Sequence, residues 1–152
     1  MNRSKRSASH ESRKPVVFGG GDLQRFYASD FPGSYTLLIR LSRPARIRIG
    51  ARGFQQFEAG LYAYTGSAMG GVWGRVRRHL AHRKTLRWHI DYLLNHRAAS
   101  VAGIVVAPSG KRHECEVNRL LHRMSGGNIT PARFGASDCR AGCPSHLVYL
   151  GR

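Results

Sequence analysis

Three runs of apolar residues constrain the fold of this chain more than any other feature of its sequence. Residues 34–41 and 100–107 are nearly continuous apolar runs, as in strands that are buried on both faces. Residues 61–66 have the same β-type character and are stopped by small residues. A fourth segment, residues 46–50, alternates polar and apolar side chains, which indicates a half-exposed strand. A sheet built from these segments is therefore expected at the centre of the fold.

Helical patterns fill the intervals between and after these runs. Apolar side chains recur at helical spacing through residues 72–82, and shorter patterns predict helices over 88–95 and 112–124. A last strand is expected around residues 146–150. The predicted fold class is α+β, with a small and mainly antiparallel β-sheet flanked by α-helices.

The chain is predicted to hold one domain preceded by a basic arm. Its 152 residues suffice for a single hydrophobic core but are short for two. Residues 1–20 are rich in Ser, Arg and Lys and run into consecutive glycines, so we expect a disordered basic arm there. Residues 21–152 would then form the single folded domain.

The charge balance predicts a polyanionic partner. The chain carries 25 Lys and Arg residues against 8 Asp and Glu residues, a formal net charge of +17. Such a surplus repels itself unless a polyanion relieves it, and the phosphate backbone of nucleic acid is the common one inside cells. DNA is the expected partner, and RNA is not excluded. A basic surface with no specific ligand ranks second, and an anionic membrane third, because the basic residues do not gather opposite one apolar helical stripe.

Several negative features place the protein in the cytoplasm. No apolar run approaches the roughly 20 residues needed to cross a bilayer, and the basic N-terminus lacks the apolar centre of a secretory signal. Three cysteines are an odd number, which argues against a disulfide framework and for a reducing compartment. The oligomeric state has no signature in the sequence.

Two tyrosines and two small residues suggest a site for phosphate chemistry. Tyr64 lies at the end of its strand run, just before Gly66 and Ser67, whose small size allows a phosphate to approach closely. Tyr35 belongs to the strand that is expected to pair beside it. A tyrosine hydroxyl can orient or deprotonate a water molecule if neighbouring cations lower its pKa from about 10.

The helix that follows supplies basic side chains. Arg75 and His79 are four residues apart, so one helical face presents both to the same place. A guanidinium matches two phosphate oxygens and stays ionised. Arg77 and Arg78 are expected to contact nucleic-acid phosphates without reading bases.

A carboxylate would complete a hydrolytic site. Phosphodiester hydrolysis usually needs a metal ion, and one carboxylate is enough to anchor Mg²⁺ or Mn²⁺, which keeps several waters. Glu114 is the preferred source and Glu116 its alternative, since an error in helix phase would exchange them. The shortage of acidic residues leaves few other candidates.

Other conspicuous residues have simpler structural interpretations. His89 and Asp91 suggest a catalytic His/Asp pair, but a structural hydrogen bond between them, with Trp88 as a packing anchor, is favoured. Tyr62 is expected to face away from Tyr64 and to lie in the core.

A zinc site is the less favoured interpretation of the cysteines. Cys115, Cys139, Cys143 and His146 total four potential ligands, and four nitrogen or sulfur ligands suit structural zinc. The spacing of the last three is not that of a familiar zinc knuckle, however, and small buried thiols are common in protein cores.

Six sequence blocks in order carry a resemblance to a known superfamily. The stretches GSYTLLIRL, GLYAYTGSAMGG, RVRRHL, WHIDYLL, HECE and FGASDC…CPSHLVYL span residues 33–150. They resemble the GIY-YIG nuclease superfamily and, more closely, its DUF123 branch, the Uri superfamily of endonucleases. The resemblance implies a GIY-YIG-like fold and a metal-dependent endonuclease that is structure-directed or single-strand-directed rather than sequence-specific.

The resemblance also implies roles for individual residues. Tyr35 would act as general base or water-orienting group with support from Tyr64. Arg75 would stabilise phosphate charge, His79 would assist the tyrosine or the phosphate, and Glu114 would hold the metal ion.

The chain departs from the superfamily pattern in three places. The first motif reads GSY rather than GIY, and the distance between Tyr35 and Tyr64 implies an inserted hairpin around residues 44–58. The asparagine that often follows the metal-binding glutamate has no clear counterpart, and Ser137 or Asp138 is its substitute. Two other functions therefore stand beside the enzyme: a non-catalytic nucleic-acid-binding module on the same scaffold, and an RNA-associated basic protein.

Overall fold

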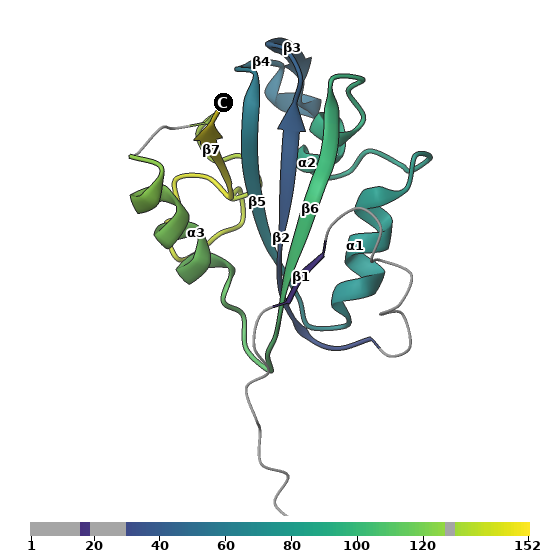
Figure 1. Cartoon of the computed structure of the whole chain (residues 1–152), viewed down its shortest axis with the longest axis vertical. Helices are drawn as coiled ribbons and strands as arrows, with labels where there is room; N and C mark the ends of the chain where they lie inside the picture. The colour runs from purple at the N-terminus through teal and green to yellow at the C-terminus, as the bar shows by residue number, and fades with distance from the viewer. Residues whose placement is uncertain (1–15, 19–29, 127–129) are drawn as a thin grey trace, which may run out of the picture.

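The fold is built on a five-stranded sheet in which every pair of neighbouring strands is antiparallel (Figure 1). The computed structural model describes residues 16–18, 30–126 and 130–152. The strand order is β1-β6-β2-β5-β7. In chain order, the strands are β1 (Val16–Phe18), β2 (Gly33–Leu41), β5 (Gly60–Ala68), β6 (Ala99–Pro108) and β7 (Leu147–Gly151). The predicted α+β class and its mainly antiparallel sheet are confirmed.

A small separate hairpin forms the insertion expected around residues 44–58. Its strands are β3 (Ala45–Arg48) and β4 (Phe54–Phe57), joined by a single 3-10 turn at Gly50–Arg52. The strand predicted over residues 46–50 therefore ends at Arg48, because Gly50 adopts a φ of +48°, which belongs to a turn.

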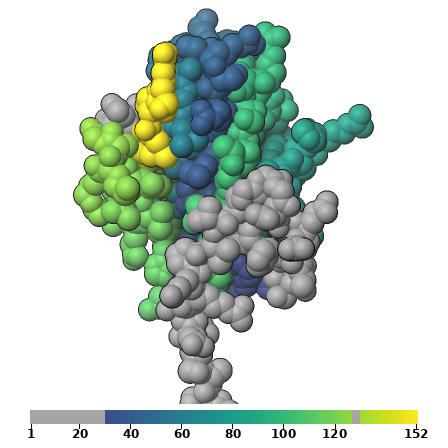
Figure 2. Space-filling model, in the orientation of Figure 1, coloured from purple at the N-terminus to yellow at the C-terminus, as the bar shows by residue number. Residues whose placement is uncertain are grey.

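Three helices flank the main sheet. α1 (Val72–Leu80) and α2 (His89–Leu94) lie on one side of it, and α3 (Glu114–Met124) lies on the other side beside β5 and β7 (Figure 1). The space-filling view shows α3 against the edge formed by β7 and β5 (Figure 2). The three predicted helices are confirmed, with ends that differ by one or two residues.

Strand alternation gives the sheet two chemically distinct faces. Tyr35 pairs with Gly66 and Leu37 with Tyr64, so these residues share the face toward α1, called here the tyrosine face. Ser34 pairs with Ser67 on the opposite side, called here the α3 face.

The expectation that Tyr62 faces away from Tyr64 is wrong. Residues two apart in a strand point the same way, and both side chains lie on the tyrosine face. Tyr62 is nevertheless buried as expected, with 2% of its surface exposed. Its ring packs against Phe57 of the inserted hairpin and Tyr149 of β7.

The start of α1 is fixed by a carboxylate from outside the helix. Gly71 precedes α1 and offers no capping side chain, but Asp30 accepts hydrogen bonds from the backbone N–H groups of Trp73 at 2.9 Å and Gly74 at 3.0 Å. Burial opposes ionisation of Asp30, yet these bonds hold its pKa below the usual value. A Cβ at position 71 would collide with this carboxylate, so glycine is required there.

The N-terminal arm predicted over residues 1–20 falls mostly outside the described residues. The exception is the short apolar segment Val16–Phe18, which forms β1 and pairs with β6. Within the part of the chain that the structure describes, no helix is long and apolar enough to cross a membrane.

Candidate active site

A buried tyrosine–histidine pair joins the sheet to α1. The hydroxyl of Tyr35 lies 2.8 Å from Nε2 of His79, and the two residues expose only 4% and 2% of their surfaces. Gly66 lies across the strand pair from Tyr35, and a Cβ there would collide with the Tyr35 hydroxyl. The glycine expected to admit a phosphate thus first makes room for the Tyr35 ring.

Burial sets the protonation of this pair and of Tyr64, whose ring packs edge-on against His79. It raises the pKa of Tyr35 well above its usual value and that of Tyr64 to about 12, while the Arg75 guanidinium pulls both downward. Burial also lowers the pKa of His79 to about 4. Both tyrosines therefore carry their protons at neutral pH and His79 is neutral. The neighbouring cation does not lower either tyrosine pKa below 10, so this arrangement favours orienting a water over deprotonating it.

The buried histidine predicts a loss of stability in acid. Because its folded pKa of about 4 lies below the ordinary 6.5, the unfolded chain binds the proton more readily. The contribution of neutral His79 to the free energy of unfolding is complete above pH 6.5 and falls by about 2–3 kcal/mol as the pH drops toward 4. Urea unfolding at a series of pH values should show this slope, and His79→Gln should flatten it. The same substitution at exposed His82 should leave the slope unchanged; equal slopes in wild type and His79→Gln would contradict the assignment.

Trp88 holds two arginines of α1. The guanidinium carbon of Arg75 lies 4.4 Å from the centre of the Trp88 ring, and that of Arg78 lies 3.9 Å from it. Beyond this contact Arg75 has no hydrogen bond or ion pair with any residue in the described ranges. It is half-buried beside the tyrosines, so its charge is positioned yet available for an anion.

Arg78 is committed to a buried carboxylate instead. It donates two hydrogen bonds to Asp91, at 2.8 and 2.9 Å, and Asp91 is fully buried. Asp91 also accepts the backbone N–H groups of Arg87 and Trp88, both at 3.0 Å. Burial alone would raise the Asp91 pKa, but these donors lower it to about 2. Arg78 thus has an internal ion pair, and its contact with phosphates stays a prediction.

Trp88 and His89, at the start of α2, make structural contacts with other segments. Trp88 packs against His79, with ring centres 5.8 Å apart. The expected bond between His89 and Asp91 is wrong, because Nδ1 of His89 accepts the backbone N–H of Gly135 at 2.9 Å.

Glu114 lies on the other face of the sheet from the tyrosines. Its carboxylate accepts a hydrogen bond from Ser67, whose hydroxyl lies 2.8 Å from that of Ser34. These serines point toward α3, so the structure does not bring Glu114 to the tyrosine pair, and Ser67 is occupied by this network. Glu116, the alternative, is exposed and hydrogen-bonded to Nδ1 of His113 at 2.9 Å.

Asp138, an exposed carboxylate, acts electrostatically on Tyr64. Burial and the charge of Asp91 raise the pKa of that hydroxyl more, and the charge of Asp138 adds to them. Its loop reaches the tyrosine face through Phe134, whose ring centre lies 6.5 Å from that of Tyr64. The sequence signal for it was the FGASDC block.

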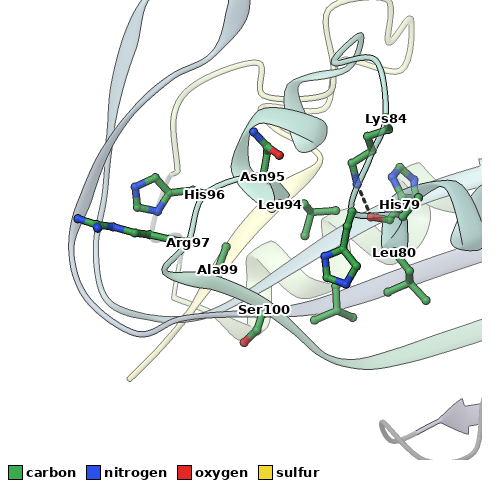
Figure 3. A pocket seen from close by; sticks show the side chains of 12 residues that line it. His79, Leu80, Lys84, Leu94, Asn95, His96, Arg97, Ala99 and Ser100 are labelled. Carbon is green, nitrogen blue, oxygen red and sulfur yellow. Dashed lines mark hydrogen bonds between the residues drawn. The ribbon is translucent and has the colours of Figure 1, made fainter.

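A pocket of about 430 Å³ opens behind His79, between the end of α1 and the connection from α2 to β6 (Figure 3). Lys84 reaches across it to the backbone carbonyl of His79, and burial lowers the Lys84 pKa. Neither tyrosine nor Arg75 lines this pocket. It therefore borders the candidate site without containing its chemistry.

The structure also brings together the four possible zinc ligands. One donor atom from each of Cys115, Cys139, Cys143 and His146 lies within 4.8 Å of every other.

Fold and site together define an α+β domain with a buried tyrosine–histidine pair beside an arginine that has no anionic partner among the described residues. Residues 34–152 match the family described as Domain of unknown function DUF123, and the chain therefore belongs to that family. None of the curated proteins and none of the solved structures compared with the chain matches it.

Proposed function

We propose that this protein hydrolyses phosphodiester bonds in nucleic acid, with DNA as substrate, by the chemistry of the GIY-YIG nucleases. The observation that carries the proposal is the position of Arg75. Its guanidinium is held on Trp88, lies near both tyrosines and has no carboxylate partner in the described part of the chain. A fixed, half-buried cation of this kind suits a phosphate group.

Each residue of the cluster has a chemical task in this proposal. Arg75 binds the non-bridging phosphate oxygens and stabilises the charge that develops on them. Tyr64 orients the attacking water. Tyr35 helps to fix the positions of these side chains through its hydrogen bond to His79, which stays neutral above pH 4. The exposed Arg77 contacts neighbouring phosphates and sets the salt dependence of binding.

A divalent ion, Mg²⁺ or Mn²⁺, would supply Lewis acidity at the phosphate. One carboxylate can anchor it, because such ions retain waters and lean on the substrate. Of the two carboxylates whose charge acts on Tyr64, Asp91 is already bound to Arg78, which leaves Asp138. Glu114 is held by Ser67 on the α3 face. We therefore place the ion with Asp138 and keep Glu114 as the competing ligand.

A non-catalytic nucleic-acid-binding module is the second candidate, and one observation favours it. Burial raises the pKa of both tyrosines, so neither is a ready base in this state. Such a module would bind nucleic acid through Arg75 and the surface charge without cutting it.

A panel of labelled substrates distinguishes the candidates. Single-stranded DNA, duplex DNA, a flap and single-stranded RNA would be incubated with the full chain in Mg²⁺, Mn²⁺ or EDTA. We expect metal-dependent cleavage of at least one DNA substrate. Binding without cleavage in every metal condition would identify the protein as a non-catalytic nucleic-acid-binding module. Cleavage of RNA alone would show that the substrate is RNA and not DNA.

Substituting the two carboxylates tests the metal assignment. We expect Asp138→Ala to lower the cleavage rate about 100-fold, because the ion loses its protein ligand. Glu114→Ala should lower it less than 10-fold. Single-turnover cleavage over a range of Mn²⁺ concentrations measures both effects, with exposed Glu58→Ala as the matched control. A larger loss of rate in Glu114→Ala than in Asp138→Ala would show that Glu114, not Asp138, is the metal ligand.

A further inference from the structure

We propose that Cys115, Cys139, Cys143 and His146 bind one zinc ion that has a structural role. Three thiols and one imidazole form a donor set that Zn²⁺ prefers, and four protein ligands close its coordination shell. A closed shell leaves no position for a reacting water, so this ion stabilises the fold and does not take part in hydrolysis. The inference does not depend on the proposed nuclease activity.

The spacing of the sulfur atoms fits a tetrahedral ion. Sγ of Cys115 lies 3.6 Å from Sγ of Cys139, and all four donor atoms lie within 4.8 Å of one another. Zinc bonds to sulfur of about 2.3 Å in tetrahedral geometry place two sulfurs about 3.8 Å apart. A disulfide would require about 2.05 Å, and all three cysteines are free.

The histidine supplies an independent indication of a ligand. His146 is 91% buried, with 9% of its surface exposed, and its buried Nε2 atom has no hydrogen-bond partner among the described residues. Its imidazole lies beside the Cys139 thiol. A buried ring nitrogen without a partner costs free energy, and a metal bond removes that cost. Cys143 is equally enclosed, with 1% of its surface exposed.

Two segments that are distant in sequence supply the ligands: the start of α3, and the residues just before β7. Cys115 lies in the first turn of α3, and Cys139 and Cys143 lie in the loop that precedes β7. Gly142 adopts a φ of +73° between these two cysteines, which turns the loop back toward the cluster. His146 is fixed at the sheet edge, because its carbonyl accepts the backbone N–H of Thr65 at 3.1 Å.

The ion would therefore tie α3 and this loop to the edge of the sheet. It would add to two contacts between α3 and the loop, in which Arg119 donates to the carbonyl of Ala141 at 2.8 Å and Nε2 of His122 lies 3.1 Å from the carbonyl of Ser145. The bond from Ser67 to Glu114 links α3 to the sheet. The same loop carries Phe134 against Tyr64. Zinc binding thus supports one wall of the candidate site from the opposite face of the sheet.

Metal analysis of the purified full chain tests the proposal. We expect one zinc per chain after exhaustive dialysis against metal-free buffer, and at least a tenfold lower content in Cys139→Ser and His146→Ala. Cobalt added to the metal-free protein should give the intense charge-transfer and visible bands of a thiolate-rich tetrahedral site. His82→Ala, an exposed histidine outside the cluster, should retain full zinc content.

The cobalt spectrum of the wild-type chain keeps the test decisive if the cysteine variants do not fold. Zinc below a tenth of an equivalent, together with three thiols that react freely or a disulfide between Cys115 and Cys139, would overturn the proposal. Full zinc content in both Cys139→Ser and His146→Ala would overturn it as well, since the ion would then lie elsewhere.

Discussion

Arg75→Ala is expected to reduce the rate of cleavage about 100- to 1,000-fold while leaving the fold intact. Removing one preorganised donor to a developing oxyanion typically costs this much in catalysed reactions. The fold should be spared because Arg75 has no ion pair with a described residue, so its loss leaves no buried charge unpartnered. Single-turnover cleavage of the best substrate of the panel, with a thermal unfolding curve for each variant, measures both effects.

Two further variants show whether the geometry of Arg75 matters or only its charge. Arg75→Lys keeps the charge but loses the planar fork and should recover less than a tenth of the lost rate. Arg43→Ala removes an exposed arginine from the turn after β2, at the far end of that strand from Tyr35, and should change the rate less than threefold. If Arg75→Ala and Arg43→Ala cleave equally well, Arg75 is surface charge and the proposed role is wrong.

The part of the site that follows from local sequence rules was predictable. The apolar runs around Tyr35 and Tyr64 are long enough to identify strands, and pairing of neighbouring strands brings both rings to one face. The four-residue spacing of Arg75 and His79 then predicts that one face of the next helix presents both side chains to the same place. The prediction for Tyr62 was wrong, since strand alternation places residues 62 and 64 on the same face.

The rest depended on tertiary geometry that no local pattern records. Which face of the sheet α3 covers is decided by the path of the chain after β6, and that path takes Glu114 to Ser67 and away from the tyrosines. The Arg78–Asp91 pair joins two different helices, α1 and α2, so helical spacing could not show that Arg78 was committed. The cysteine cluster likewise brings Cys115 of α3 to the residues just before β7, a contact that spacing along the chain does not record.

Asp91→Ala is expected to cost about 3–5 kcal/mol of stability, the range for breaking a buried ion pair by removing one partner. Asp91 is fully buried and accepts four hydrogen bonds, two from Arg78 and two from backbone N–H groups. Its loss would leave the charge of Arg78 and both N–H groups without their acceptor. For a domain of this size the melting temperature should fall by about 10 °C. Because Arg78 and Arg75 share the Trp88 ring, cleavage should fall as well.

The pH dependence of stability shows whether the charge of Asp91, and not only the packing of its side chain, stabilises the fold. Its folded pKa of about 2 lies below the ordinary 3.8, so its contribution is complete above pH 3.8 and is lost as the pH falls through 2. Wild type should therefore lose about 2 kcal/mol between pH 4 and 2 that Asp91→Asn does not lose, whereas Glu58→Gln, at an exposed carboxylate, should follow wild type. A double-mutant cycle with Arg78→Gln should give a coupling energy above about 1 kcal/mol. A coupling energy near zero would mean that the Arg78–Asp91 pair does not hold Trp88 and Arg75 in place. The position of Arg75 on the Trp88 ring would then depend on other contacts.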